Sequence, residues 1–317
     1  MNIWQELPKP FFVLAPMEGV TDHVFRRVVN SSAPADLYFS EFTNATGWVH
    51  AGEKAVAGRL TIHPDEDYPM IAQIWCSQPG DIAKLAKYCK KLGYKGIDLN
   101  MGCPAKTAVK NSGGSAMIKN PELASKIIQS AKTAGLPVSV KTRLGYSTVC
   151  EWQDWLSHLL AQDIAALTIH LRTKKEMSKV PAHWELAIDI KKLRDEISPQ
   201  TMLVGNGDVS DRKHALKLIE ETGVDGIMIG RGIFTNIFAF DSSFESKEPS
   251  RLGQMKKLRH HLDLFDKSNS TKPYETLKRF FKVYIRDFPG SHELRADLME
   301  TNSTAEAREK ISEYLKS

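Results

Sequence analysis

The sequence predicts an α/β protein, a closed (β/α)₈ barrel followed by a smaller all-helical domain. Between residues 11 and 234, short apolar runs alternate with amphipathic helical stretches, which indicates βα units and a parallel sheet. Eight such runs occur, which is the number that closes a barrel, whereas an open doubly wound sheet is the alternative for the same alternation. After Phe240 the runs stop and only helical patterns follow. We therefore favour the barrel with an appended helical domain.

The predicted strands are short runs rich in Val, Ile, Leu and Phe. They lie at residues 11–17, 37–42, 70–75, 96–102, 137–145, 166–172, 202–208 and 226–232. Helices predicted between them include residues 79–93, 121–135 and 210–223, each of which begins at Pro or a Ser/Asp cap and ends at Gly. The segments LGYKGIDLN (92–100) and TGVDGIMIG (222–230) resemble each other, as expected of repeated βα units.

The C-terminal part has a different pattern. A polar linker, DSSFESKEPS (241–250), precedes predicted helices at 251–267, 274–288 and 303–317, so we place the domains at 1–243 and 244–317. Residues 247–286 contain eleven Lys or Arg against four Asp or Glu, in a chain whose net charge is +5. Such a run is either a solvated helix face or a contact for a polyanion. Its aromatic residues recur at helical spacing, which indicates core positions.

Composition excludes several classes of protein. With 42% hydrophobic and 26% charged residues the chain is globular, and neither an export signal nor an apolar run of about 18 residues occurs, so we expect a cytoplasmic protein without membrane contact. The four cysteines form no C-x-x-C pair, and no H-E-x-x-H motif occurs, which argues against a metal site and against disulfides.

Functional groups of such barrels lie at the carboxyl ends of the strands. The residues there are Pro16, Met17, Glu18, Gln73, Asn100, Cys103, Lys141, Arg143, His170, Arg172, Asn206, Gly207, Asp208, Gly230 and Arg231. A single strand-end lysine or histidine is often structural, but recurrence at successive strands favours a site. The glycine-rich ends of the last two strands are typical of phosphate binding through backbone N–H groups. Together they predict a pocket for a planar, phosphate-bearing ligand.

Cys103 follows the fourth predicted strand between Gly102 and Pro104. This placement favours a thiol at the barrel mouth, and a thiol with an ordinary pKa near ~8.5 is protonated at neutral pH and can act as a general acid. Cys76 and Cys89 lie within strand and helix patterns and are expected to be small buried residues.

Seven segments resemble, in order, those of the tRNA-dihydrouridine synthases: LAPMEGVTD (14–22), DLNMGCPAK (98–106), GGSAMIKNP (113–121), SVKTRLGY (139–146), TIHLRT (168–173), GNGDV (205–209) and MIGRG (228–232). The resemblance implies a TIM barrel that binds FMN, uses NADPH as reductant and reduces the C5=C6 bond of a uridine in tRNA. It also implies that the helical domain helps to hold the tRNA.

Residue roles follow from the same resemblance. Cys103 would give a proton to C5 while the flavin passes hydride to C6. Cofactor contacts would come from Pro16, Met17, Glu18, Gln73, Lys141 and His170 along the ring and from Asn206, Gly207, Asp208, Gly230 and Arg231 at the phosphate. Substrate contacts would come from Asn100, Lys106 and Arg143, with loop 105–115 as a gate. Leu171 stands where the family has Gly, and the loop at 173–182 also departs from the family pattern.

Two other interpretations stay open. One is a flavin barrel acting on a small pyrimidine, like a dihydroorotate dehydrogenase, although the basic C-terminal segment has no purpose there. The other is an RNA-binding barrel that has lost its cofactor. In each case we expect a monomer, and the sequence does not identify the modified uridine.

Overall fold

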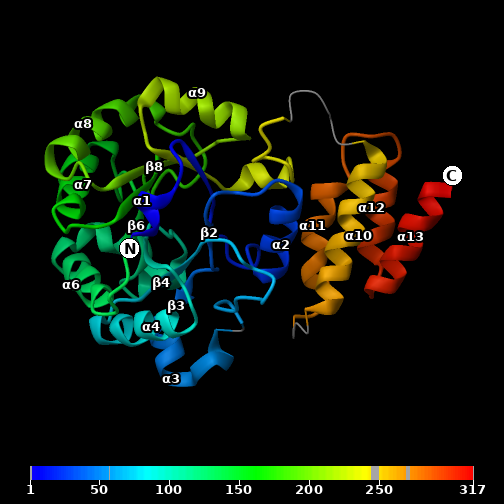
Figure 1. Cartoon of the computed structure of the whole chain (residues 1–317), viewed down its shortest axis with the longest axis horizontal. Helices are drawn as coiled ribbons and strands as arrows, with labels where there is room; N and C mark the ends of the chain where they lie inside the picture. Colours follow the sequence, from blue (N-terminus) through cyan, green and yellow to red (C-terminus); the bar gives the residue numbers. More distant parts are fainter. Residues whose placement is uncertain (1, 57, 244–249, 269–271, 317) are drawn as a thin grey trace.

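The computed structural model describes residues 2–56, 58–243, 250–268 and 272–316, and Figure 1 shows a barrel beside a bundle of helices. The predicted barrel and the helical C-terminal region are confirmed. The linker predicted at 241–250 lies largely outside the described residues, and the domain boundary between 243 and 244 stays a proposal.

One parallel sheet forms the barrel. Its strands are β1 (Phe11–Leu14), β2 (Tyr38–Phe39), β3 (Thr43–Asn44), β4 (Met70–Trp75), β5 (Gly96–Met101), β6 (Val138–Arg143), β7 (Ala166–His170), β8 (Met202–Asn206) and β9 (Gly226–Ile229). They follow the order β1-β9-β8-β7-β6-β5-β4-β2. A parallel bridge between Val13 and Leu37 brings β1 to β2, and Leu14 N–H donates to Leu37 O at 3.1 Å. The sheet therefore closes on itself.

The strand predicted at 37–42 is shorter in the structure, where β2 covers Tyr38–Phe39 and a second short strand, β3, follows at Thr43–Asn44. Phe39 pairs with Ile71 and Thr43 with Ile74, so the chain between β2 and β3 holds one residue more than the facing part of β4. The extra residue bends the chain as a β-bulge does. The side chain of Ser40 fills the break, because its Oγ accepts from Gln73 N–H at 3.0 Å.

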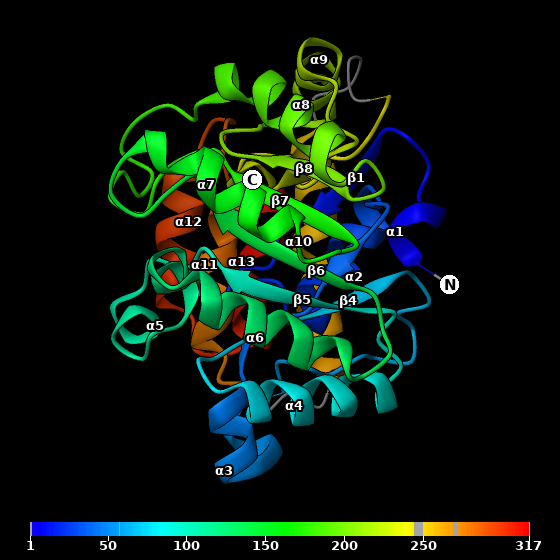
Figure 2. The ribbon, with the colours of Figure 1, turned by 90° about the vertical axis from the view of Figure 1, so that its left-hand side faces the viewer.

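Helices cover the outside of the strands (Figure 2). They are α2 (His23–Ser32), α3 (Ala45–Ala55), α4 (Pro79–Lys91), α6 (Pro121–Lys132), α7 (Trp152–Leu160), α8 (Ala187–Ile197) and α9 (Arg212–Thr222). Their starts follow capping rules: the side chains of Asp22, Asn120 and Asp211 accept backbone N–H groups at the beginnings of α2, α6 and α9. No helix among the described residues is long and apolar enough to cross a membrane.

Apolar side chains fill the barrel interior at the amino ends of the strands. The short helix α1 (Ile3–Glu6) brings Trp4 against Phe11 at the start of β1, with ring centroids 6.0 Å apart, and both side chains are fully buried. Aliphatic residues of the other strands complete this layer. Polar side chains, among them Gln73, Asp98 and Ser139, are also buried in the strands. Because apolar side chains fill the amino end of the barrel, a site can form only at the carboxyl ends of the strands.

The C-terminal helices are α10 (Arg251–Lys267), α11 (Glu275–Tyr284), α12 (Ser291–Glu300) and α13 (Thr304–Lys316). α12 was not predicted from the sequence; its buried residues are Leu294 and Leu298. The aromatic residues of α11 are core residues as predicted, since Phe280 is buried and its ring stacks on Phe25 of α2 at 4.8 Å. This contact joins the helical bundle to the barrel.

Candidate active site

A cavity of about 550 Å³ opens at the carboxyl ends of β1, β6, β7, β8 and β9. It is lined by nine residues predicted to bind a cofactor, namely Pro16, Met17, Lys141, His170, Asn206, Gly207, Asp208, Gly230 and Arg231, together with Ala15, Ser178, Val209, Ser210, Gly232 and Thr235. Residues from five strands meet here because parallel strands present their carboxyl ends at the same edge of a barrel.

A lysine ammonium group lies in the cavity wall. Lys141 Nζ donates to Asn206 Oδ1 at 3.3 Å, and the amide of Asn206 donates in turn to Met228 O at 2.8 Å. Burial, together with repulsion from Arg143, lowers the pKa of Lys141 to about 8. A cation that is costly to bury is stabilised when an anionic or strongly polar group binds beside it. This wall therefore suits the electron-rich edge of a ligand.

The imidazole of His170 is neutral. Burial and the nearby charges of Lys141, Arg143 and Arg172 lower its pKa far below the ordinary value. Arg172 Nη1 donates to His170 Nε2 at 3.1 Å, so the ring proton is carried by Nδ1. His170, which lines the cavity, is thus neutral and carries its one ring proton on Nδ1.

The carboxylate of Asp208 is neutralised by two arginines. It forms an ion pair with Arg172 and accepts from Arg231 Nη2 at 3.2 Å. An unpaired carboxylate here would repel a phosphate, and the two ion pairs offset its charge. Through them Asp208 also helps to position Arg231 and the loop that contains Asp208. Arg172, which also donates to Val180 O at 2.7 Å, is a positioning residue to which the sequence analysis gave no role.

The glycines of this end have packing reasons as well. A Cβ at Gly207 would lie 2.8 Å from the Cβ of Ala182, and one at Gly232 would lie 2.5 Å from Val209 O. A side chain at either position would therefore clash, with the Ala182 side chain at Gly207 and with the main chain at Gly232. Gly207, Gly230 and Gly232 all line the cavity.

Cys103 is not among the residues that line this cavity, but its thiol is close enough to the lining residue Lys141 for their charges to interact. The backbone is fixed on both sides, because Cys103 N–H donates to Asn100 Oδ1 at 2.9 Å and Ser115 N–H donates to Cys103 O at 2.9 Å. Cys103 is partly exposed, whereas Cys76 and Cys89 are buried as predicted. Burial of the thiol, reinforced by the carboxylate of Glu18, raises the pKa of Cys103. The thiol therefore stays protonated at neutral pH, as a proton donor requires.

A buried chain of hydrogen bonds leads from the barrel interior to Cys103. Ser139 Oγ donates to Asp98 Oδ1 at 2.6 Å, and Gln73 Nε2 donates to Asp98 Oδ2 at 2.7 Å. Asn100 Nδ2 donates to Gln73 Oε1 at 3.0 Å, which leaves Asn100 Oδ1 to accept from the Cys103 N–H. Asp98 thus sets the orientation of both amides.

Asp98 was not among the predicted site residues. The signal was a carboxyl group inside the apolar run GIDLNMG, two residues before Asn100 and hence on the same face of β5. Gln73 is fully buried and belongs to this chain of hydrogen bonds. It is not among the residues that line the cavity.

Besides Gln73, Asn100 and Cys103, three further predicted residues lie outside the cavity wall. The side chain of Glu18 is 52% exposed and pairs with Arg59 at 3.0 Å. Arg143 is buried and donates to the carbonyls of Gly102 at 2.9 Å and Thr173 at 3.0 Å, so it fastens the end of β5 to the loop at 173–182. Lys106 is exposed on α5 (Lys106–Lys110), which forms part of the loop predicted to be a gate.

A second cavity, of about 850 Å³, lies between the barrel rim and the helical bundle. We call it the basic groove, since it is lined by Lys278, Arg279, Lys282, Arg286, His292 and Arg295, with Phe234, Thr235, Asp287, Ala296 and Met299. Thr235 lines both cavities, so the two adjoin. Among the described residues, no group of three or more His, Cys, Asp or Glu side chains could hold a metal ion.

Residues 13–317 match the family model described as Dihydrouridine synthase (Dus). The chain belongs to the dihydrouridine synthase family. It is 54% identical to a probable tRNA-dihydrouridine synthase 2 of Bacillus subtilis, over 99% of this chain and 96% of the relative. It is 52% identical to a probable tRNA-dihydrouridine synthase of Staphylococcus aureus, over 99% and 95%. The family predicted from the motifs is thus confirmed, and with it the class of enzyme, a flavin-dependent oxidoreductase.

A solved structure shares the barrel. Histamine dehydrogenase from Rhizobium sp. 4-9 superposes with a TM-score of 0.55 at 12% sequence identity, covering 81% of this chain and 49% of the other. At this identity the similarity concerns the fold alone.

Proposed function

We propose that this dihydrouridine synthase uses FMN and NADPH to reduce the C5=C6 bond of a uridine in tRNA, with Cys103 as the proton donor. The observation that carries the proposal is the thiol of Cys103, which is fixed through its backbone and is close enough to Lys141 in the cavity wall for their charges to interact. A thiol beside a flavin pocket is the arrangement needed when hydride and proton reach neighbouring carbons.

The residues of the cavity suit FMN. The buried ammonium of Lys141 suits the polar edge of a flavin ring, because a cation there stabilises the anionic reduced form. Bound in the cavity, FMN would supply the hydride for C6, with NADPH as the electron source. His170, Pro16 and Met17 would complete the ring site. The phosphate would be held by Arg231 and by the stretches around Asn206, Gly207 and Gly230, while Glu18, Gln73 and Asp208 act through their neighbours.

Cys103 is the proton donor of the proposal. Its raised pKa keeps the proton on Sγ, and the hydrogen bond from its backbone to Asn100 fixes the approach of the thiol. Transfer of that proton to C5 leaves a thiolate that the nearby cations Arg143 and Lys141 stabilise. Arg143 is therefore proposed to act on Cys103 rather than on the substrate.

The basic groove is the proposed tRNA contact. Lys278, Lys282 and Arg286 line it, and it adjoins the flavin cavity at Thr235, so an RNA backbone lying in it would hold a uridine near the cavity. The target base must leave its stack to reach a pocket inside a barrel. Lys106 and Asn100 remain candidates for contacts with that nucleotide. A small pyrimidine as substrate would leave the groove without purpose.

The test is dihydrouridine mapping in tRNA from a strain lacking the gene. At least one position should lose dihydrouridine and recover it with the wild-type gene but not with the Cys103→Ala gene. A Cys150→Ala gene, which changes an exposed thiol, is the matched control. Unchanged dihydrouridine at every position, with no other synthase compensating, would refute the proposal. Purified protein that lacks flavin absorbance would also count against it.

Three finer points need their own measurements. Stopped-flow reduction of the flavin by NADPH and by NADH decides the reductant, for which we propose NADPH. Light scattering decides the oligomeric state, for which we propose a monomer. A cytoplasmic location is proposed from the sequence alone.

A further inference from the structure

Residues 16–22, which we call the Met17 loop, form part of the cavity wall through Pro16 and Met17. The loop is a tight turn: Met17 N–H donates to Thr21 Oγ1 at 2.8 Å, and Thr21 N–H donates to Met17 O at 3.0 Å. Gly19, at its tip, has a φ of +70°. Because two hydrogen bonds join Met17 to Thr21 across the turn, contacts made at Gly19 bear on the position of Met17.

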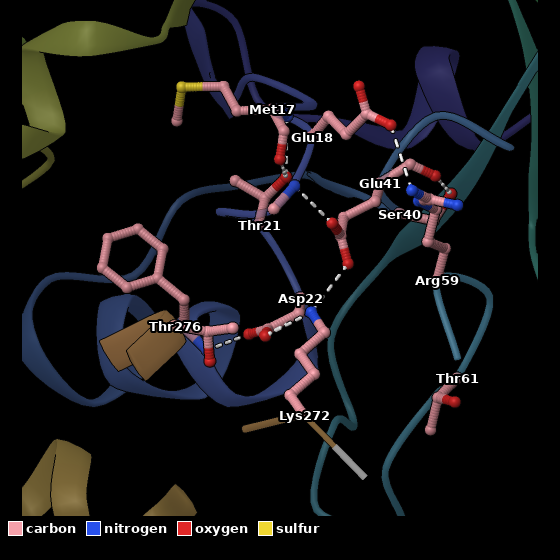
Figure 3. A network of polar contacts seen from close by, with 12 residues as sticks. Met17, Glu18, Thr21, Asp22, Ser40, Glu41, Arg59, Thr61, Lys272 and Thr276 are labelled. Carbon is pink, nitrogen blue, oxygen red and sulfur yellow. Dashed lines mark hydrogen bonds and ion pairs between the residues drawn. The ribbon is translucent and has the colours of Figure 1, made fainter. Parts of the chain in front are cut away.

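Gly19 is held on both of its polar groups. Its N–H donates to Glu41 Oε1 at 2.6 Å, and its carbonyl accepts from Arg279 Nη1 at 2.9 Å. Glu41 belongs to the bulge between β2 and β3 and its side chain is 2% exposed. Figure 3 shows Glu41 reaching toward the loop from the neighbouring segment.

One lysine of the helical region joins both acidic groups of this network. Lys272 Nζ lies 2.8 Å from Asp22 Oδ2 and 3.3 Å from Glu41 Oε2 (Figure 3). Asp22, at the end of the Met17 loop, also accepts from Phe25 N–H at the start of α2. An ammonium group that lies between two carboxylates attracts both and offsets their mutual repulsion. Lys272 therefore fixes both carboxylates that border the loop.

We propose that Lys272 is a positioning residue for the flavin cavity and acts through Glu41 on the Met17 loop, with Arg279 as a second tie from the same helical region. On this proposal, which rests on the proposed flavin site, the C-terminal region supports the wall of the flavin cavity from outside and also lines the basic groove. Arg279 lines the basic groove and also donates to the carbonyl of Gly19, so one guanidinium group joins the groove to the Met17 loop.

The test compares Lys272→Gln with Lys256→Gln in the full-length protein. Lys256 is an exposed lysine of α10, so its replacement removes the same charge from the same region without touching the loop. FMN affinity of the apoprotein, measured by flavin fluorescence, should fall about tenfold for K272Q, as expected when a charged hydrogen-bond partner of a buried acid is lost. It should stay at the wild-type value for K256Q. R279Q should also weaken FMN binding. This binding is measured without RNA, because Arg279 lines the basic groove as well.

Further readouts separate positioning from a loss of folding. In a double-mutant cycle, E41Q should weaken FMN binding in the wild-type background and add little in the K272Q background, because both changes act on one contact. The KM for tRNA of K272Q should stay unchanged while kcat falls. Wild-type FMN affinity and kcat in K272Q would overturn the inference and leave the proposed function intact. Failure of the wild-type protein to bind FMN would instead overturn the proposed function.

Discussion

Replacing Asp98 by Asn should stabilise the apoprotein above neutral pH. Asp98 is fully buried, and Ser139 and Gln73 donate to its two oxygens. An asparagine keeps the geometry, because its carbonyl oxygen can accept from Gln73 while its amide donates to Ser139 Oγ. The substitution therefore removes a buried charge and leaves the chain of hydrogen bonds to Asn100 and Cys103 connected.

The magnitude follows from the pKa. Burial raises the pKa of Asp98 from 3.8 to about 6, so the folded state prefers the neutral carboxyl group. The stabilisation that this preference provides is complete below pH ~4 and is lost as the pH rises through about 6. A pKa difference of about two corresponds to roughly 3 kcal/mol at ~1.36 kcal/mol for each pKa unit. The neutral asparagine side chain avoids this loss, so the advantage of D98N over wild type should grow by about 1.5 kcal/mol between pH ~5 and pH ~8.

Thermal unfolding of the apoproteins at pH ~5 and pH ~8 measures the effect. The midpoint of D98N should exceed that of wild type at the higher pH by several degrees more than any difference at the lower pH. Asp163→Asn, which removes an exposed acid, is the control and should show no such dependence on pH. If D98N destabilises the protein equally at both pH values, Asp98 is a satisfied carboxylate with an ordinary pKa and our reasoning is wrong.

The remaining predictions concern the site. Cys103→Ala should bind FMN and tRNA normally yet lose ~10²- to 10⁴-fold in turnover, as the loss of a general acid does, and near-normal single-turnover rates would remove Cys103 from its role. Because the pKa of Lys141 is about 8, its positive charge is lost as the pH rises through that value. The affinity for FMN, measured by fluorescence titration, should therefore fall between pH ~7 and pH ~9. Lys141→Met should abolish this dependence on pH. Lys282→Gln and Arg286→Gln should each weaken tRNA binding and reduce the slope of log affinity against log salt by about 1, whereas an unchanged slope would exclude them as phosphate contacts.

Local patterns along the chain were sufficient for the order of the barrel strands and for nine residues that line the cavity. Strands at 70–75 and 96–102 are apolar runs with clear ends, and Cys103 directly follows one of them. Lys141 and His170 could be placed at one rim because parallel strands in a barrel end at the same side. α12 could not be predicted from the sequence, because its two buried leucines, four residues apart, form too short an apolar stripe to indicate a helix.

The contacts between polar groups emerged only from the three-dimensional arrangement. Gln73 and Asp98 are far apart in the sequence and make a 2.7 Å hydrogen bond, and Lys272 reaches Glu41 across 231 residues. The ion pairs of Asp208 with Arg172 and Arg231 likewise appear only in the structure, and its predicted contact with the phosphate stays a prediction. Such pairings depend on how strands and helices are placed in space, and the pattern of apolar residues along the chain specifies the elements without specifying which polar side chains meet between them.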